Sequence, residues 1–438
     1  MYISSVLFAI VFFVAIGVFT RNIRRIIRNI NLGRKTDRYD QRSKRWKHMV
    51  RVALGQSKMV VRPISGLLHV IVYVGFVVIN IELLEIVLDG LLGTHRVLSP
   101  YLGGIYDVLI ATFEIFALLV IIAVSVFWLR RNVMNIRRFW KAEMRGWPKK
   151  DANFILYIEL VLMFLFLTMN ASDYWLQQHP EGQSYYTQAG SFPVSSWITP
   201  FFDEMPFTTV VYIERTAWWL HILGILVFLN YLYYSKHLHI LLAFPNTFYA
   251  NLNPLGRFSH SEAVANGVKL MMDPSADPSV HPTVESEPLR FGASDVNHLT
   301  RVQLMNAYSC TECGRCTDVC PANLTGKKLS PRKIMMDTRD RLEQVGKQLN
   351  LGLEMDKNVL LDNYISREEL WACTTCNACV EACPISIDPL SIIMDMRQYL
   401  VLEQSSAPKE LNAMMTNIEN NGAPWPFNQQ DRLNWSKE

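Results

Sequence analysis

The chain has 438 residues, of which half are hydrophobic, and its formal net charge is +4. Its eight cysteines all belong to two motifs in the last third of the chain, which leaves no thiol for disulfide or nucleophilic chemistry. The basic residues gather beside apolar stretches, a pattern that indicates membrane topology and argues against nucleic acid as a partner.

Five apolar stretches precede residue 245, and each is close to the roughly 20 residues that a helix needs to cross a bilayer. They cover residues about 3–20, 63–88, 105–128, 152–171 and 216–235, the last of which could extend to 244. We expect five transmembrane helices, because runs such as FILYIELVLMFLFLTM are too apolar for a soluble core. The first stretch lacks a basic leading region and a small-residue cleavage site, so we expect a retained anchor and not a secretory signal.

The distribution of charge predicts the orientation. Residues 21–62 carry fourteen Lys and Arg against two acids, and residues 129–151 carry eight Lys and Arg. The loops 89–104 and 173–215 hold one arginine each. The positive-inside rule therefore predicts that the basic loops and the C-terminal part lie in the cytoplasm, whereas the N-terminus and loop 173–215 lie outside.

Histidines within or beside these stretches are candidate ligands of a b-type haem, which needs two axial imidazoles. His221 and His239 are eighteen residues apart, or five turns of a continuous helix, so they would share one face while His237 would lie about 160° away. His69 and His239 would both lie roughly 8–9 Å from the cytoplasmic side. We therefore expect His69 and His239 to hold one haem b; the alternative is that His239 is an interfacial residue outside the membrane.

His221 would then need its own partner, and the remaining candidate is His95 in the outer segment GTHR. A second haem on His221 and His95 is one interpretation. The other is that His221 hydrogen-bonds a neighbouring helix and His95 caps a loop. Gly66 and Gly75 flank His69 and would leave room for a flat macrocycle.

Carboxylates are also expected at membrane depth, where they often mark proton or quinone paths. They are Glu82, Glu85, Asp89, Glu114 and Glu159. The first three repeat at helical spacing and would form one polar face. Pairing with Arg96 or with a neighbouring helix is the structural alternative.

Residues 245–300 shift toward Pro, Ser, Asp and Asn, which is typical of a linker. Helices are predicted between the cysteine motifs, because Ser330 precedes Pro331 at a first helical position and Ser366 has Glu369 three residues later. The expected fold is all-α, with a five-helix transmembrane bundle followed by a mainly helical ferredoxin domain. The predicted parts are a membrane domain over 1–245, a linker over 246–300, a cluster domain over 301–400 and a C-terminal arm over 401–438, which would dock a partner or the membrane domain.

Each cysteine motif reads C-x2-C-x2-C-x3-C-P, the spacing that binds 4Fe–4S clusters in two-cluster ferredoxins. Zinc sites use C-x2-C pairs, but two identical four-cysteine runs closed by proline are not a zinc pattern. Because the fourth cysteine of such a motif ligates the other cluster, we expect two crossed sets. One set is Cys310, Cys313, Cys316 and Cys383, and the other is Cys373, Cys376, Cys379 and Cys320.

With both halves considered, the chain resembles membrane-bound electron-transfer proteins of the heterodisulfide-reductase type. Residues 1–245, with His69 on the second helix and His221 and His239 on the fifth, are similar to the five-helix cytochrome b subunit of respiratory nitrate reductase. Residues 301–400, with LSPRKIMMDTRD after the first motif, are similar to the heterodisulfide reductase C-type subunit. The resemblance implies the cytoplasmic membrane of a bacterium or archaeon.

The chain departs from this pattern in two ways. Nitrate-reductase-type subunits carry two histidines ten residues apart on the second helix, but Met59 and Ile79 stand ten residues from His69. Heterodisulfide reductases also have a catalytic subunit with CCG-type cysteine motifs, and no cysteine remains here to form one. We therefore expect an electron-transfer subunit with no catalytic residues of its own.

The expected function is electron transfer between the quinone pool, through haem b, and a cytoplasmic redox partner, through two 4Fe–4S clusters. The resemblance implies that this partner carries CCG-type motifs. A cytoplasmic dehydrogenase that feeds the quinone pool through this chain would reverse the direction. The alternative from another class is a membrane redox sensor, whose clusters gate a partner without steady electron flow.

Overall fold

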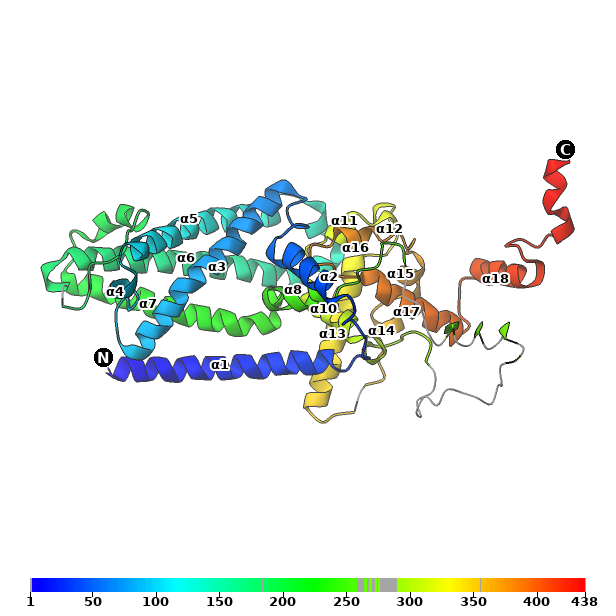
Figure 1. The fold of residues 1–438 in the computed structure, drawn as a ribbon, viewed down its shortest axis with the longest axis horizontal. Coiled ribbons are helices and arrows are strands. Elements are labelled where there is room, and N and C mark those ends of the chain that lie inside the picture. Colours follow the sequence, from blue (N-terminus) through cyan, green and yellow to red (C-terminus); the bar gives the residue numbers. More distant parts are fainter. Residues whose placement is uncertain are drawn as a thin grey trace. The chain divides into compact units, whose positions relative to one another are not determined.

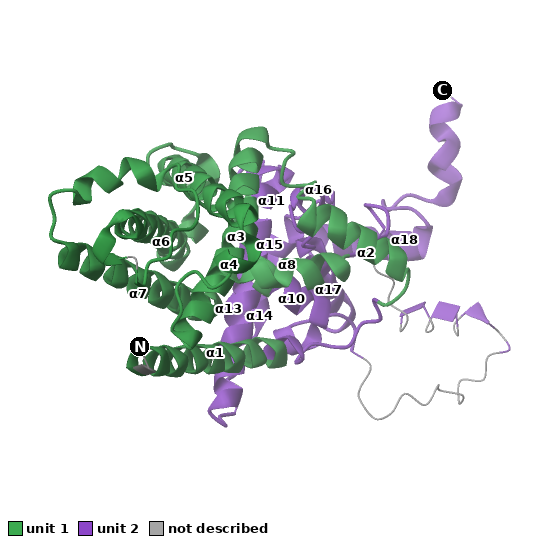
Figure 2. Ribbon diagram, turned by 60° about the vertical axis from the view of Figure 1, so that its left-hand side comes forward, with its two compact units in different colours: residues 1–28, 39–250, 308–314 green, residues 29–38, 251–307, 315–438 purple. Residues whose placement is uncertain are grey.

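The computed structural model describes residues 2–182, 184–257, 264–265, 268–269, 272–273, 275, 290–354 and 356–437. These residues form helices joined by turns and contain no strand, so the predicted all-α class is confirmed. The chain divides into two compact units, which Figure 2 distinguishes by colour. The first unit contains residues 1–28, 39–250 and 308–314, and the second contains residues 29–38, 251–307 and 315–438.

Five helices of the first unit are long and apolar enough to cross a membrane, as predicted (Figure 1). They are α1 (Tyr2–Ile30), α3 (Pro63–Leu92), α5 (Gly104–Asn132), α6 (Trp147–Gln178) and α7 (Phe207–Tyr231). The shorter helices of this unit are α2 (Arg42–Met49), α4 (Ser99–Leu102) and α8 (His239–Phe248). A π-helical turn covers Val50–Leu54, and 3-10 turns cover Arg137–Phe139, Ala142–Met144, Pro180–Gly182, Ser195–Trp197, Thr199–Phe202, Leu232–Tyr234 and Lys236–Leu238.

Proline and glycine set several helix ends. Pro63 is the first residue of α3, where its missing N–H has no helical partner. Gly93 follows the last residue of this helix and caps it, with a φ of 72°, a left-handed conformation that glycine adopts without strain. Most of the long helices extend beyond the apolar stretches from which they were predicted, because polar residues continue the helical turns past the apolar core.

The long helices pack in the order α3, α5, α6 and α7. Their shared core is apolar, and Phe113, Phe166 and Ile222 are at most 2% exposed. Large apolar side chains also point outward: Leu84 and Val227 are each 65% exposed. Such a surface suits lipid and not water, which agrees with the membrane prediction.

α1 joins this bundle through Phe8, whose ring packs against Trp218 and Trp219 of α7 with centroid distances of 5.6 and 6.2 Å. Gly90 of α3 makes this contact possible, because a Cβ at that position would lie 2.7 Å from the Phe8 ring. Most of the remaining apolar surface of α1 stays uncovered. α1 is therefore the long helix that the protein itself covers least.

The second unit is built from short helices around one longer helix. The helices of the cluster region and beyond are α10 (Arg301–Ser309), α11 (Arg315–Asp318), α12 (Pro321–Leu324), α13 (Pro331–Asn350), α14 (Leu360–Asn363), α15 (Arg367–Trp371), α16 (Ala378–Ala382), α17 (Pro389–Leu402) and α18 (Lys409–Asn421), with 3-10 turns over Val296–His298 and Gln429–Ser436. Both predicted caps are confirmed: the Ser330 side chain accepts from Lys333 N–H, and Ser366 and Glu369 form a capping box.

A buried cation organises the interior of the second unit. The guanidinium of Arg341, 1% exposed, bonds Asp295 at 2.8 Å and Asp356 at 2.6 Å. A charge can be buried at tolerable cost only when it is paired in this way. These ion pairs connect α13 to the segments that precede α10 and α14.

The fifth long helix does not continue to residue 244. α7 ends at Tyr231, a 3-10 turn follows, and Ser235 is extended, with φ −114° and ψ 150°. A new helix, α8, begins at His239. The assumption that His221 and His239 lie on one continuous helix was therefore wrong, because the extended residue interrupts the 3.6-residue repeat.

Candidate functional site

The cysteine motifs form two loops with the same backbone geometry. The residue before the second cysteine is left-handed in both motifs, Glu312 with φ 54° and Thr375 with φ 56°. The residue after it is left-handed as well, Gly314 with φ 72° and Asn377 with φ 59°. Such alternation curls the backbone and turns its N–H groups inward, as in other anion-binding loops. This geometry suits loops that surround a cluster of thiolates.

Backbone N–H groups also point at cysteine sulfurs. Thr375 N–H lies 3.4 Å from Cys373 Sγ, and Ile387 N–H lies 3.3 Å from Cys383 Sγ. Hydrogen bonds to sulfur are among the features that set the potentials of iron–sulfur clusters. All eight cysteines are free thiols in the structure.

Cys320 lies among the cysteines of the second motif. Burial raises the pKa of the Cys373 thiol, and nearby Cys320 and Cys376 contribute to the same shift. The pKa of Cys379 is also raised, first by burial and then by Cys373 and other neighbours that include Cys320. Cys320, Cys373, Cys376 and Cys379 are therefore near enough to one another to interact electrostatically.

Within the described ranges, no three His, Cys, Asp or Glu side chains converge as the ligands of one metal ion do. A 4Fe–4S cube offers a separate iron to each thiolate, so its four ligands do not need to meet at one point.

Two of the predicted haem ligands lie beside a third histidine. The rings of His237 and His239 are 5.4 Å apart between centroids. Burial lowers the pKa of His237, and the neighbouring imidazoles of His239 and His69 lower it further. His69 and His239 thus belong to one group of histidines at the end of the bundle where α3 begins and α7 ends. The placement of His237 on a distant face was wrong, because α7 stops before it.

Hydrogen bonding separates the roles of His237 and His239. His239 Nδ1 lies 3.0 Å from the carbonyl oxygen of Lys236, which can only accept, so Nδ1 carries the proton. The neutral ring then presents an unprotonated Nε2, the form that ligates iron in metal sites with such a second bond. His237 Nε2 lies 3.7 Å from a Glu159 carboxylate oxygen, and its buried Nδ1 has no hydrogen-bond partner among the described residues.

The glycines near His69 do not open a flat surface. A Cβ at Gly66 would lie 2.7 Å from Val60 Cα, and a Cβ at Gly75 would lie 2.9 Å from Val120 Cγ2. The expectation that they leave room for a macrocycle was wrong. They allow other parts of the chain to pack closely against α3.

His221 and His95 occupy separate surroundings. His221 is buried on α7 and its Nδ1 bonds the Leu162 carbonyl of α6 at 3.0 Å. His95 follows α3, where Nε2 bonds Asp173 Oδ1 at 3.0 Å and the ring packs against Tyr186. No described interaction joins the two rings, and the bond from His221 to a neighbouring helix is the structural alternative that the sequence left open.

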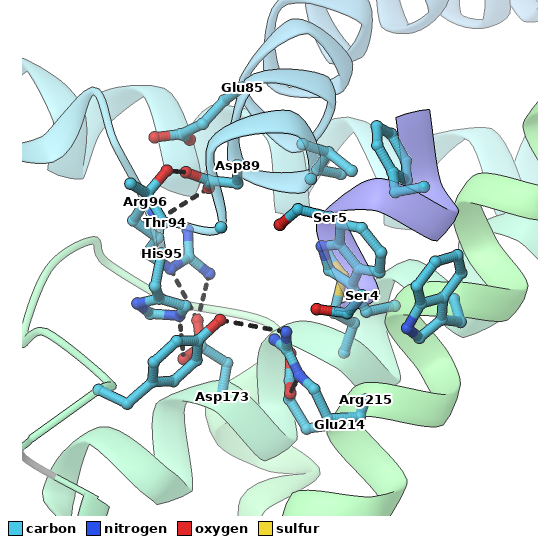
Figure 3. A pocket seen from close by; sticks show the side chains of 18 of the residues that line it. Ser4, Ser5, Glu85, Asp89, Thr94, His95, Arg96, Asp173, Glu214 and Arg215 are labelled. Carbon is cyan, nitrogen blue, oxygen red and sulfur yellow. Dashed lines mark hydrogen bonds and ion pairs between the residues drawn. The ribbon is translucent and has the colours of Figure 1, made fainter. Parts of the chain in front are cut away.

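A polar cavity of about 120 Å³ lies at the opposite end of the helices, where α1 and α7 begin and α3 and α6 end (Figure 3). Arg96 spans one side, with Nε 2.7 Å from Asp173 Oδ2 and Nη1 3.0 Å from the Tyr106 hydroxyl. Arg215 pairs with Glu214 on another side. The aromatic contact of Phe8 with Trp218 and Trp219 forms an apolar wall.

Most acids at this end hold loops. Glu85 accepts from Leu98 N–H at 3.0 Å and from the Tyr106 hydroxyl, and Asp89 accepts from Arg96 N–H at 2.8 Å. Glu114 likewise accepts from the N–H groups of residues 194 and 195. The bonds of Glu85 to Tyr106 and of Asp89 to Arg96 match the structural alternative for these two acids.

Glu82 differs from these acids. It lines the cavity and is 3% exposed, and its Oε2 has no hydrogen-bond partner among the described residues. A buried polar atom without a partner costs free energy, so this oxygen is available to hydrogen-bond a water or a ligand. Glu82 is therefore the acid of the predicted polar face that keeps unused hydrogen-bonding capacity.

Comparison with known proteins identifies the cluster region. A family model described as "4Fe-4S dicluster domain" matches residues 309–387. "Probable iron-sulfur-binding oxidoreductase FadF" of Bacillus subtilis is 29% identical over an alignment of 467 residues, gaps included, which covers 99% of this chain and 61% of that protein. "EtfAB:quinone oxidoreductase" of Syntrophomonas wolfei is 25% identical over 415 residues, which cover 88% of this chain and 53% of that protein.

A third relative is similar over a shorter stretch. "Probable membrane-anchored ferredoxin" of Chromohalobacter salexigens is 32% identical over 155 residues, or 31% of this chain and 22% of that protein. The chain spans little more than half the length of the two relatives that match most of it. No solved structure matches it.

These findings show a match to a 4Fe–4S dicluster domain in a chain with five helices that are long and apolar enough to cross a membrane. The chain is similar to iron–sulfur oxidoreductases and electron-transfer proteins over nearly its whole length. His237, Lys236 and Glu312 are site residues that sequence reasoning did not select. An acid inside a cysteine motif and a lysine three residues before a candidate ligand were the available signals.

Proposed function

We propose that this chain is a membrane-anchored electron-transfer protein that connects a quinone pool to a cytoplasmic redox partner. One observation carries the proposal: a dicluster domain and five membrane-length helices share a chain that holds a partly buried histidine group at one end of its helices. The name of one relative, a quinone oxidoreductase, supports a quinone as the substrate on the membrane side.

The proposed clusters are held by the two crossed cysteine sets. The grouping of Cys320 with Cys373 and Cys379 supports one of these sets. The spacing rule then assigns Cys383 to the first three cysteines of the first motif. When bound, the two clusters would each supply one-electron redox chemistry at the cytoplasmic end of the protein.

The cluster of the second motif is proposed to face the partner. Cys376 of the second motif is exposed, whereas no cysteine of the first motif is more than partly exposed. Electron transfer between proteins favours a cofactor close to the surface, so the cluster beside the exposed loop is the better one to exchange electrons with the partner. A redox subunit with CCG-type motifs remains the proposed partner, as the resemblance implies.

We propose that His69 and His239 hold a haem b. The donor set fits, because His239 already has the backbone hydrogen bond that fixes the tautomer of a ligating histidine. The haem would supply a one-electron carrier inside the membrane domain. His237 is then a neighbour of the site, held near Glu159. A second haem on His221 and His95 is not part of the proposal, since the structure does not bring these residues together.

The polar cavity is the proposed site at which a quinol is oxidised. Oxidation of a quinol to a quinone releases two electrons and two protons. The aromatic wall suits the ring of such a molecule, and Glu82 can accept a hydrogen bond and then a proton from a hydroxyl. The basic loops orient the cavity toward the outside, so the protons would leave on that side.

Each part of the chain that the sequence predicts has a role in the proposed function. A membrane domain over 1–245 would carry the haem and the quinone site, and a cluster domain over 301–400 would carry the clusters. The segment 246–300 would link them, and 401–438 would be a docking arm. The N-terminus would lie outside a bacterial or archaeal cytoplasmic membrane.

A spectrum separates this function from a redox sensor. A reduced-minus-oxidised spectrum of the purified protein should show a haem b that a quinol analogue reduces. A sensor whose clusters gate a partner needs no haem in the bilayer. Clusters without haem b would contradict the electron-transfer proposal.

A further inference from the structure

Lys236 is a buried cation that connects two parts of the first unit. Its side chain is 8% exposed, and its ammonium group pairs with the carboxylate of Glu312. The same ammonium donates to the Pro148 carbonyl at 2.7 Å and lies 3.7 Å from Asp151 Oδ2. Both carboxylates are at most 3% exposed. Burying these charges is tolerable only because the one cation lies between the two carboxylates.

The backbone of Lys236 has a separate role. Its carbonyl accepts from His239 Nδ1 at 3.0 Å, and its N–H donates to Asp151 Oδ2 at 3.1 Å. Asp151 also accepts from the Tyr231 hydroxyl at 2.6 Å. These bonds fix the segment that orients His239. One residue therefore touches the segment of the proposed haem ligand and, through Glu312, a cysteine loop.

Glu312 stands between Cys310 and Cys313 in the first motif. The equivalent residue of the second motif is Thr375, which has almost the same left-handed conformation. The Thr375 hydroxyl donates to the carbonyl of the adjacent Thr374 and is part of no ion pair. The left-handed conformation at this position of the loop is therefore compatible with a small polar residue and does not require an acid. The acid at position 312 is explained by its partner and not by the shape of the loop.

We propose that Lys236 is a positioning residue that couples the histidine group to the first cysteine loop. Its side chain holds the Cys310–Cys313 loop through Glu312, while its backbone orients His239. The ion pair fixes the separation between the two redox centres and makes the first-motif cluster the one that exchanges electrons with the membrane domain. This inference rests on the proposed function.

The test uses full-length protein with Lys236→Met, Glu312→Gln and the exchanged pair Lys236→Glu with Glu312→Lys. The matched control is Lys328→Met, which removes a surface ion pair with Glu368 whose side chains are 68% and 60% exposed. Three quantities are measured: haem and iron content, the rates of haem and cluster reduction by a quinol analogue, and hydrogen exchange of the backbone over residues 308–314.

Both single variants should keep haem and iron and reduce the haem at the normal rate. Cluster reduction should slow by about tenfold or more, because a small loss of positioning has a large effect on rate. Backbone exchange over 308–314 should accelerate, and the exchanged pair should restore part of both properties. Lys328→Met should change neither.

The inference would be overturned if both single variants kept the normal rate of cluster reduction and the normal backbone hydrogen exchange over residues 308–314. Lys236→Arg covers the case in which Lys236→Met fails to fold, because it keeps the charge and should preserve protection of the loop. If the unaltered protein shows no reduction by quinol, the proposed function fails. The exchange measurement still decides whether Lys236 holds the loop.

Discussion

The centroids of the imidazole rings of His237 and His239 lie 5.4 Å apart. In a continuous helix, side chains two positions apart would point in nearly opposite directions. The extended residue Ser235 is the cause, since it ends the register of α7 and starts a new turn. The Ser235 hydroxyl accepts from His237 N–H at 3.1 Å and fixes that turn. This arrangement brings both rings to the end of the bundle that also holds His69.

The two neighbouring histidines should respond differently to substitution. We expect His239→Ala to lose haem b, because it removes the imidazole with the ligand-competent tautomer. His237→Ala should keep the haem, since that ring is held near Glu159 and is not the proposed ligand. The measurement is the haem absorbance of the reduced protein per polypeptide. Retention of haem by the first variant and its loss from the second would reverse the assignment.

Crossed ligation predicts which cluster a cysteine substitution removes. Cys320→Ser should lose the cluster of the second motif, because Cys320 lies with Cys373 and Cys379. Iron content should fall by about half, since the other set is intact. Electron paramagnetic resonance of the reduced protein should show the same remaining cluster as in Cys376→Ser. If Cys320→Ser instead matches Cys313→Ser, ligation is not crossed.

Glu82 should matter for quinol oxidation and not for the ability of the haem to be reduced. Glu82→Gln keeps the shape of the side chain and removes its capacity to accept a proton. We expect quinol oxidation to slow by about 10²-fold, the size of a typical general-base contribution. Reduction of the haem by dithionite should be unchanged. A normal rate with quinol would exclude Glu82 as the proton acceptor.

A control at Glu85 separates chemistry from structure. This carboxylate accepts from Leu98 N–H and the Tyr106 hydroxyl, so Glu85→Gln weakens a loop anchor. It should lower thermal stability and affect quinol oxidation less than Glu82→Gln does. Equal effects of both variants on rate would indicate damage to the cavity and not loss of a proton acceptor.

The buried ion pairs of Arg341 should dominate the stability of the second unit. Arg341→Met leaves Asp295 and Asp356 without their cation, and removal of one partner of a buried pair costs about 3–5 kcal/mol. The free energy of unfolding can be followed by the loss of cluster absorbance in urea. Arg367→Met is the control, since its pair with Asp362 is exposed and should contribute less than about 1 kcal/mol.

The sequence predicted the elements that depend on local patterns. Apolar length revealed the five long helices, the motif spacing revealed the cluster region, and Ser330 and Ser366 revealed two helix starts. Each of these signals lies within a short stretch of chain. They did not require any knowledge of which segments meet.

Features that depend on distant contacts were not predicted. The break at Ser235 lies in a polar and aromatic run with no proline or glycine, so its sequence carries no strong stop signal. The pairing of Lys236 with Glu312 joins residues 76 positions apart. The polar face of α3 was recognised, but only the folded loops show that Asp89 is a loop anchor while Glu82 keeps an unpartnered oxygen.

The most direct test is anaerobic addition of a quinol analogue to the purified full-length protein, followed by optical and electron paramagnetic resonance spectra. The proposal predicts that a haem b is reduced first and that the signal of a reduced 4Fe–4S cluster follows. His239→Ala should abolish both responses to quinol while dithionite still reduces the clusters. The opposite result would be a protein whose clusters are reduced by dithionite but which shows no haem band and no response to quinol. That result would contradict the proposed electron transfer.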